Sequence, residues 1–301
     1  MRVSGFLKRW NMSVDMTQAA VITVKCQSRP GIIAAFSQAV VECDGDIKDI
    51  NQFNDRMQDR YFMRMACTVR AADMPLLSRR LDSVAGRLGA YHQLRERQQP
   101  VRTLIMTSRF DHCLNDLLYR WRNGELPMMQ PVGIVSNHPL SVACGRVHLG
   151  DIPFHHLPVT DEGRDGQEDA LRAVMEDSGA ELLVLARYMQ VFSDRFVRDV
   201  EGRCINIHRS FLPGFRGQEP YRQASLRGVK LIGATAHYVT TDLDEGPIIE
   251  QDIEQITHTD TIEDLVRKGR DIERRVLARA VRYHLDGRVF LNDDRTVVFP
   301  D

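Results

Sequence analysis

Hydrophobic positions in the first third of the chain follow two spacings, one typical of strands and one typical of helices. Residues 19–25 read AAVITVK, a β-branched run that predicts a buried strand. Residues 74–88 repeat leucine and valine on one side of a helical wheel. The predicted elements are strand 19–25, helix 32–41, strands 47–53 and 61–69, helix 74–88 and strand 91–94. This order predicts a ferredoxin-like βαββαβ domain.

The pattern changes after residues 95–100, a polar stretch ending in proline that is typical of a linker. Beyond it, apolar runs alternate with helical patterns, which predicts a Rossmann-like α/β domain with a mainly parallel sheet. The predicted strands are 102–106, 132–136, 153–157, 182–186, 204–207, 231–239 and 248–253, with helices 114–122, 168–177, 194–200 and 261–284 and a closing hairpin 289–291/296–299. Ligands of such sheets bind beyond the carboxyl ends of the strands.

These patterns divide the chain into four parts. We expect a poorly ordered tail over residues 1–18, a first domain over 19–96, a linker over 97–101 and a catalytic domain over 102–301. The tail carries basic residues but no apolar core of signal-peptide length, so a targeting segment is the less favoured interpretation.

Composition excludes several classes of protein. The 40 Lys and Arg residues nearly balance 41 Asp and Glu, so no basic field indicates nucleic acid as a partner. No apolar run reaches the roughly 18 residues of a membrane helix, so we expect no membrane partner. The six cysteines show no zinc-ligand spacing and no C-x-x-C pair. We therefore expect reduced thiols, no metal site and a cytoplasmic location.

Chemistry is concentrated where an apolar strand ends in Asn206 and His208. Residues two apart in a strand point to the same face, so both side chains can meet one substrate. Asparagine can donate to a developing oxyanion, and histidine can exchange a proton near neutral pH. The acidic loop 240–247 could supply a carboxylate that orients the histidine or holds a water molecule. A structural Asn-x-His and a solvated acidic turn remain open as alternatives.

Two further residues allow two interpretations each. His237 either supports the catalytic residues from behind or is a strand histidine satisfied by backbone. Cys113 is either a nucleophile or a small buried hydrophobe. The stretch 107–112 lacks the glycines with which a loop after a first strand cradles phosphate, which disfavours a phosphorylated acceptor. The side chains of residues 107–112 could instead fill the pocket that an acceptor would occupy and leave room only for water.

The longest motifs resemble those of a known family. Asn206-Ile207-His208 with the following Ser-Phe-Leu-Pro-Gly, the segment GATAH at 233–237 and LDEGPII at 243–249 resemble the folate-dependent formyltransferases. That family includes glycinamide ribonucleotide transformylase and methionyl-tRNA formyltransferase. The resemblance implies that Asn206, His208 and Asp244 are the catalytic residues.

A narrower resemblance points to the formyltetrahydrofolate deformylase branch. It is carried by DHCLNDLL at 111–118, VSNHP at 135–139, LARYMQ at 185–190 and RKGRDIE at 267–273. Arg29-Pro30-Gly31-Ile32 and Phe62-Met63-Arg64 resemble the ACT domain that these enzymes carry, so the likeness covers residues 19–300. It implies hydrolysis of 10-formyltetrahydrofolate to formate and tetrahydrofolate, which supplies formate for purine synthesis and balances one-carbon pools.

The resemblance also implies partners and contacts. It implies a folate substrate, no cofactor and no metal, glycine or methionine as an effector, and a homo-oligomer, either a dimer or a tetramer. The implied substrate-binding residues are Met189, Gln190, Val191, Phe192, Thr240, Thr241 and Leu243. Arg209 and Gln218-Glu219 depart from the branch's pattern, which keeps two alternatives open. These are a formyltransferase acting on an amine and a folate- or amino-acid-binding sensor.

Overall fold

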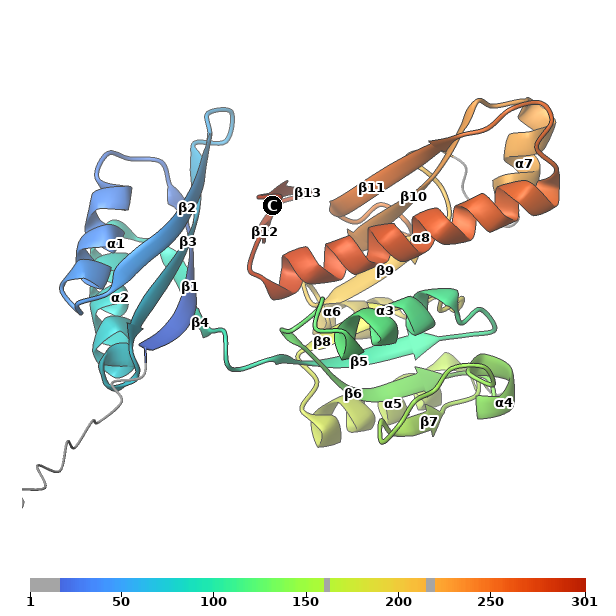
Figure 1. Cartoon of the computed structure of the whole chain (residues 1–301), viewed down its shortest axis with the longest axis horizontal. Helices are drawn as coiled ribbons and strands as arrows, with labels where there is room; N and C mark the ends of the chain where they lie inside the picture. The colour runs from blue at the N-terminus through green and yellow to red at the C-terminus, as the bar shows by residue number, and fades with distance from the viewer. Residues whose placement is uncertain (1–16, 160–162, 215–219) are drawn as a thin grey trace, which may run out of the picture. The chain divides into compact units, whose positions relative to one another are not determined.

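The computed structural model describes residues 17–159, 163–214 and 220–301. The chain divides into two compact units, Met1–Gln98 and Gln99–Asp301 (Figure 1). The expected tail, residues 1–18, lies outside the described residues except for its last two, which begin the first strand. In the described part of the chain, no helix is both long and apolar enough to span a membrane.

The N-terminal unit is a four-stranded antiparallel sheet with two helices. Its elements are β1 Thr17–Gln27, α1 Ile32–Val41, β2 Asp46–Asp55, β3 Arg60–Arg70, the short 3-10 helix Ala71–Asp73, α2 Met74–Leu88 and β4 Tyr91–Glu96. The strand order is β2-β3-β1-β4, so the predicted βαββαβ fold is confirmed and is consistent with an ACT-like domain. Phe36 of α1 and Leu77 and Leu81 of α2 pack on the sheet with Ile22 and Met65, all fully buried.

The C-terminal unit is a seven-stranded sheet covered by helices. Its elements are β5 Val101–Thr107, α3 His112–Arg122, β6 Met129–Ser136, α4 Leu140–Ala143, β7 Phe154–His156, α5 Arg164–Ser178, β8 Leu182–Leu185, α6 Asp194–Asp199, β9 Cys204–His208, α7 Pro220–Arg227, β10 Leu231–Tyr238, β11 Ile248–Gln255, α8 Ile262–Leu285, β12 Val289–Asn292 and β13 Arg295–Val298. The order is β11-β10-β9-β8-β5-β6-β7. Strands β9, β8, β5, β6 and β7 run parallel to one another. Strand β10 runs antiparallel to both of its neighbours, β9 and β11. The sheet is therefore mainly parallel, as predicted.

Two hydrophobic cores cover the two faces of this sheet. One core contains α3, α8 and the β9 residues Ile205 and Ile207. The other contains residues of α5 and α6 together with Cys204. Because side chains alternate along a strand, Asn206 and His208 leave β9 on the same face as Cys204. The candidate catalytic residues and α8 therefore lie on opposite faces of one strand.

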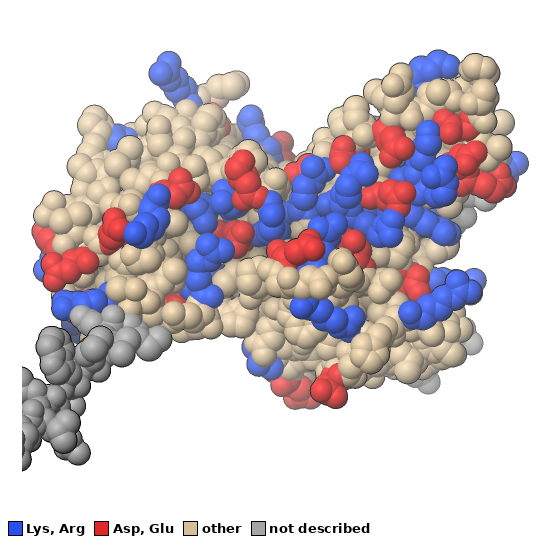
Figure 2. All heavy atoms as spheres, in the orientation of Figure 1, with Lys and Arg blue, Asp and Glu red and all other residues tan. Residues whose placement is uncertain are grey.

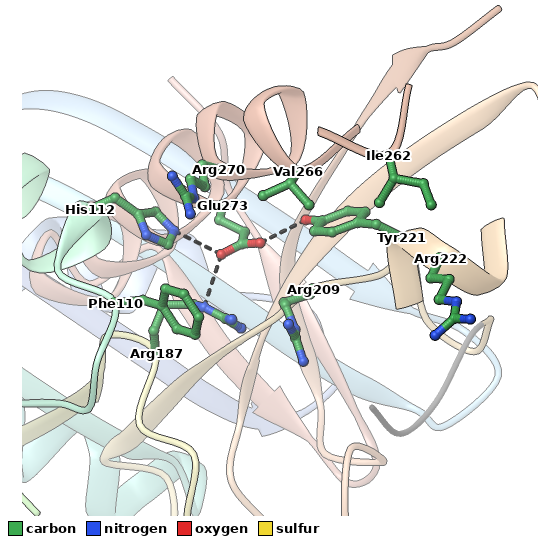
Figure 3. Close-up of a pocket in the computed structure, with 10 residues that line it drawn as sticks. All are labelled: Phe110, His112, Arg187, Arg209, Tyr221, Arg222, Ile262, Val266, Arg270 and Glu273. Atoms are coloured by element: carbon green, nitrogen blue, oxygen red, sulfur yellow. Dashed lines mark hydrogen bonds and ion pairs between the residues drawn. The ribbon is translucent and has the colours of Figure 1, made fainter. Parts of the chain in front are cut away.

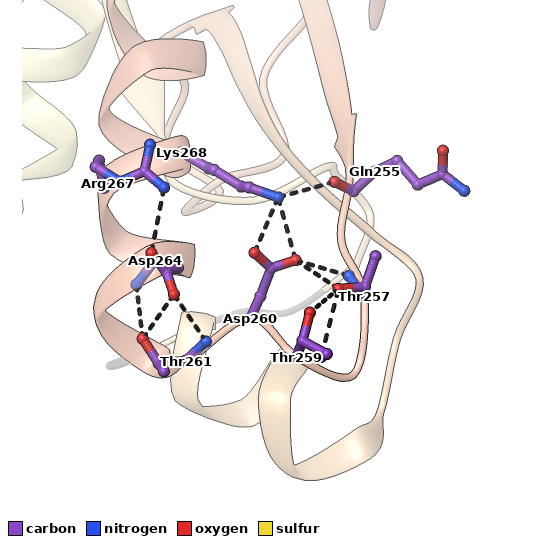
Figure 4. A network of polar contacts seen from close by, with 8 residues as sticks. All are labelled: Gln255, Thr257, Thr259, Asp260, Thr261, Asp264, Arg267 and Lys268. Carbon is purple, nitrogen blue, oxygen red and sulfur yellow. Dashed lines mark hydrogen bonds and ion pairs between the residues drawn. The ribbon is translucent and has the colours of Figure 1, made fainter.

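Helix α8 begins at a capping box that a second polar network supports (Figure 4). The Thr261 side chain accepts a hydrogen bond from the Asp264 backbone N–H, and the Asp264 carboxylate accepts one from the Thr261 backbone N–H. Lys268 donates to Asp260 and to the Gln255 carbonyl, which fixes the turn before the helix. The capping arrangement satisfies backbone donors that the first helical turn leaves unpaired.

Arginine and acidic side chains share the outer face of α8 (Figure 2). Arg274 pairs with Asp271 on the helix itself, and Arg275 and Arg279 pair with Asp252 of β11. Arg267, Arg270 and Arg275 on this stretch of the helix are exposed. Exposed pairs of this kind contribute little stability individually.

Glu273 differs from these charged neighbours, because it points inward and is 1% exposed. Tyr221 of α7 donates to one carboxylate oxygen at 2.7 Å. His112, at the start of α3, and the Arg187 Nε lie 2.8 and 3.1 Å from the other oxygen (Figure 3). Burial opposes the charge, but the His112 hydrogen bond and the Arg187 charge outweigh it and hold the pKa of Glu273 below its usual value.

Gly269 of α8 makes room for the Tyr221 ring, and a stability measurement can test this. A Cβ at Gly269 would lie 2.1 Å from the Tyr221 hydroxyl oxygen. We expect Gly269→Ala to lower the free energy of unfolding by about 2 kcal/mol, although alanine normally favours a helix. The control is Gly166→Ala in α5, where a Cβ meets no atom within 4 Å. Equal stability of the two variants in urea denaturation would contradict this packing.

The buried carboxylate gives a pH-dependent prediction. Glu273→Gln should lower the free energy of unfolding at pH 7 by about 3 kcal/mol or more, because it leaves Arg187 buried without its charge partner. The pKa of Glu273 in the folded chain lies below its ordinary 4.5. Its stabilisation is therefore present above that value and is lost as the pH falls through the folded pKa.

Denaturation of wild type and variant between pH 7 and pH 3 measures this difference. The matched control is Leu277→Ala, which removes a fully buried side chain on the same helix and should cost a comparable amount at every pH. A gap between wild type and Glu273→Gln that stays constant over this range would show that the carboxylate is not held charged.

Candidate active site

Asn206 and His208 are placed by the antiparallel pairing of β9 with β10. His208 lies opposite Thr235, and Asn206 lies opposite His237. Cross-strand partners share a face of the sheet, so Asn206, His208 and His237 are neighbours. The sequence prediction that Asn206 and His208 project together therefore agrees with the strand register.

Asp244 reaches this group from the loop between β10 and β11. Its backbone is in the left-handed region at φ 57, which aspartate tolerates better than most residues. Gly246 allows the loop to return tightly, since a Cβ there would lie 1.8 Å from the Tyr238 carbonyl oxygen. The Asp244 carboxylate lies 3.2 Å from the His208 Nδ1, and both side chains are largely buried. The loop thus brings Asp244 to His208.

His237 orients Asn206. Its Nδ1 lies 2.9 Å from the Tyr238 carbonyl oxygen, so that nitrogen carries a proton and donates. Its Nε2 then accepts from the Asn206 amide nitrogen at 3.2 Å. Burial lowers the pKa of His237, which favours this neutral form. The geometry therefore supports the interpretation of His237 as a residue behind the catalytic group.

The arrangement can carry acid–base chemistry at a carbonyl carbon. The contact with Asp244 through Nδ1 directs the Nε2 of His208 away from that carboxylate, as in other histidine–carboxylate pairs. An amide nitrogen carries two hydrogens, so Asn206 can hold His237 with one and offer the other to an oxyanion. In this arrangement His208, as proton donor, and Asn206, as oxyanion donor, could both reach one substrate group from the same strand.

The first predicted folate segment follows β8. The Met189 backbone N–H donates to the Ser108 hydroxyl at 3.3 Å, and Ser108 donates to Asn137 at 2.7 Å, which ties the ends of three strands together. Met189, Gln190 and Val191 are exposed. Phe192 is 7% exposed, and its ring packs between those of Tyr188 and Phe196. The Phe192 ring therefore belongs to the α5/α6 core.

The second predicted folate segment lies in the loop of Asp244. Thr240 donates from its hydroxyl to the Asp242 carbonyl at 3.1 Å, which shapes the start of the loop. Thr241 is exposed, and Leu243 is 61% exposed. An exposed leucine beside Asp244 gives this loop an apolar surface.

A cavity of about 240 Å³ lies on the α8 side of the strand ends. It is lined by Phe110, His112, Arg187, Arg209, Tyr221, Arg222, Ile262, Val266, Arg270 and Glu273 (Figure 3). Arg209 thus faces this cavity, whereas Gln218 and Glu219 lie outside the described residues. The contribution of Arg187, Tyr221 and Glu273 to this cavity was not predicted from the sequence. The one available signal was an acidic residue, Glu273, beside the buried Ile272 and Val276 of α8.

Cys113 is fully buried, and burial raises the pKa of its thiol, which favours the interpretation as a small hydrophobe. Donor atoms of His112, Cys113 and Glu273 lie within 4.8 Å of one another. However, the Arg187 guanidinium already approaches the same Glu273 oxygen, and its charge opposes a metal cation there. All six cysteines are buried and unpaired.

Comparison with known proteins places this fold and site in a family. Residues 101–281 match the formyl transferase family. A formyltetrahydrofolate deformylase of Corynebacterium sp. (strain P-1) is 44% identical over 280 residues, which is 92% of this chain and 97% of the relative. The Bacillus subtilis (strain 168) protein of the same name is 41% identical over 281 residues, 92% of this chain and 93% of its own.

Solved structures agree. A formyltetrahydrofolate deformylase from Burkholderia mallei ATCC 23344 superimposes with a TM-score of 0.87 at 45% identity, over 94% of this chain and 99% of its own. Glycinamide ribonucleotide transformylase 1 from Symbiobacterium toebii gives 0.63 at 29% identity, over 69% of this chain and 98% of its own. The deformylases therefore match both units, and the transformylase matches a smaller part. The chain belongs to the formyl transferase family, within its formyltetrahydrofolate deformylase branch.

Proposed function

We propose that this protein hydrolyses 10-formyltetrahydrofolate to formate and tetrahydrofolate. The observation that carries the proposal is the pairing of His208 with Asp244 beside Asn206, in a chain that aligns with named deformylases over nearly its full length. Water adds through its oxygen to the formyl carbon, and the bond from that carbon to N10 breaks. N10 gains a proton, and formic acid loses one to become formate.

Each residue has a defined part in this reaction. Asn206 donates to the oxyanion that forms on the formyl oxygen. His208 protonates N10 as it leaves or assists at the oxyanion. Asp244 orients His208 through Nδ1, stabilises its protonated form and positions the water. The reaction as proposed uses these side chains and water, with no cofactor and no metal.

The surrounding loops are proposed to bind the folate. Met189, Gln190 and Val191 follow β8, with Phe192 supporting them from the core. Thr240, Thr241 and Leu243 come from the loop of Asp244. The enzyme would act in the cytoplasm and supply formate for purine synthesis.

Transfer of the formyl group to an amine is the alternative that the likeness to glycinamide ribonucleotide transformylases favours. The glycine-free loop 107–112, which sends Phe110 and His112 into the cavity on the α8 side, argues for water instead. Incubation of the purified protein with 10-formyltetrahydrofolate and no amine separates the two. Formate and tetrahydrofolate appear in equal amounts only if water is the acceptor.

The proposed roles predict the kinetics of three variants. His208→Ala and Asp244→Asn should each lower turnover by at least about a hundredfold, the scale of lost acid–base catalysis. Asn206→Ala should lower kcat more than it raises KM, because an oxyanion donor acts mainly in the transition state. The control is Asp242→Asn, a change of an exposed acid in the same loop. Formate release near the wild-type rate from folded His208→Ala would remove the mechanism.

The N-terminal unit is proposed to bind glycine or methionine and to assemble the chain into a dimer or tetramer. Gly31, at φ 89, is the N-cap of α1, and the first backbone N–H groups of this helix are proposed to bind the carboxylate of the amino acid. Calorimetry on the full chain should show binding of the amino acid but not of glycinamide or methioninamide, which lack that carboxylate. Absence of heat and of any thermal shift with both amino acids would leave this unit with an assembly role alone.

A further inference from the structure

The cavity on the α8 side is lined by the residue that directly follows His208, a proposed catalytic residue. His208 is the last residue of β9, and Arg209, the next residue, lines the cavity. Arg187 comes two residues after the end of the neighbouring strand β8, whose Leu185 pairs with Asn206. Both arginines therefore stand at the strand ends where the formyl carbon is attacked. The cavity lies on the face opposite the proposed catalytic side chains.

The cavity wall is strongly basic. Its described lining residues include four arginines, Arg187, Arg209, Arg222 and Arg270, and one acidic residue, Glu273. That carboxylate already accepts hydrogen bonds from His112 and Tyr221 and pairs with the charge of Arg187, so it is committed to the wall itself. Such a cavity attracts anions and repels ammonium groups.

Arg187 is a buried guanidinium that the protein holds in place. It is 5% exposed, its Nε lies 3.1 Å from Glu273, and its Cζ lies 5.4 Å from the centre of the Phe110 ring. Figure 3 shows the guanidinium passing Phe110 and extending toward Arg209. The Nε lies beside Glu273, and the rest of the guanidinium extends beyond that contact. A guanidinium fixed in this way matches the two oxygens of a carboxylate.

We propose that this cavity is a binding site for a small carboxylate, and that formate released at His208 is its natural occupant. The second part rests on the proposed function, because formate is the product of that reaction, and the first part does not. Phe110, Ile262 and Val266 offer an apolar wall to the C–H side of the ion. The volume of about 240 Å³ exceeds formate alone, so acetate should also enter.

The test measures binding without folate. The full chain is titrated with ¹³C-formate, and the line width of the formate signal is followed by NMR. Saturable broadening is expected, and acetate should reverse it, whereas ammonium should not. Arg187→Lys keeps a positive charge beside Glu273 but loses the planar guanidinium, whose two N–H donors can bind both oxygens of a carboxylate. It should weaken formate binding by about fivefold or more, and Arg270→Gln should weaken it severalfold. The matched control is Arg267→Gln, on the same helix but outside the cavity lining, which should bind formate as wild type does.

Several results would overturn the assignment. One is the absence of saturable broadening up to about 100 mM formate, a range that allows for weak binding of so small an ion. Another is equal affinity in wild type, Arg187→Lys and Arg270→Gln. Displacement of formate by sulfate but not by acetate would show a general anion site and would also reject a carboxylate site.

A parallel assay keeps the two proposals distinct. Formate binding in a chain that releases no formate from 10-formyltetrahydrofolate would support the carboxylate site and reject the proposed function. Formate release without formate binding would do the reverse. When both hold, formate and acetate should inhibit turnover in wild type and Arg267→Gln, and about fivefold more of either should be needed in Arg187→Lys. Equal inhibition in wild type and Arg187→Lys would place the inhibitory site elsewhere.

Discussion

The buried carboxylate of Glu273 is the contact on which the geometry of the strand ends depends. A charge removed from water is tolerated only when donors replace the water, and here they come from three other segments of the chain. His112 begins α3, Arg187 follows β8, and Tyr221 lies on α7. One side chain of α8 therefore fixes the helix, the turn after β8 and the short α7 relative to each other. Asn206 and His208 lie on the opposite face of β9. The contacts of Glu273 therefore also help to hold these proposed catalytic residues in place.

Much of the fold could be predicted because apolar periodicity carries it. The helices at 32–41 and 74–88 have the predicted bounds, and strands and helices alternate along the C-terminal unit as predicted. Helix α7 was missed because its pattern is weak. Among its residues 221–227, Tyr221 and Ala224 are the ones that lie in the buried core. A four-residue helix such as 140–143 is likewise too short to show any period.

The candidate site, too, was predictable from the sequence only in part. Asn206 and His208 share a predicted strand, so alternation alone places them together. The choice of Asp244 over Asp242 came from family likeness, and the structure adds the left-handed backbone that turns Asp244 inward. Glu273 could not be predicted, because its partners lie between 52 and 161 residues away in sequence. Neighbouring charges on α8 made it resemble one more solvated acid.

Under the two proposals, the two faces of the strand ends have separate tasks, and this separation would explain how one fold can serve both hydrolysis and transfer. In the proposed reaction, the face of Asn206, His208 and Asp244 activates a formyl group, whatever the acceptor. The acceptor's nature depends on which side chains occupy the α8 face. Here that face carries aromatic and guanidinium groups locked to a carboxylate, which disfavour a protonated amine and leave water unhindered. Specificity in such a fold is then set by electrostatics behind the strand, with the catalytic residues unchanged in front of it.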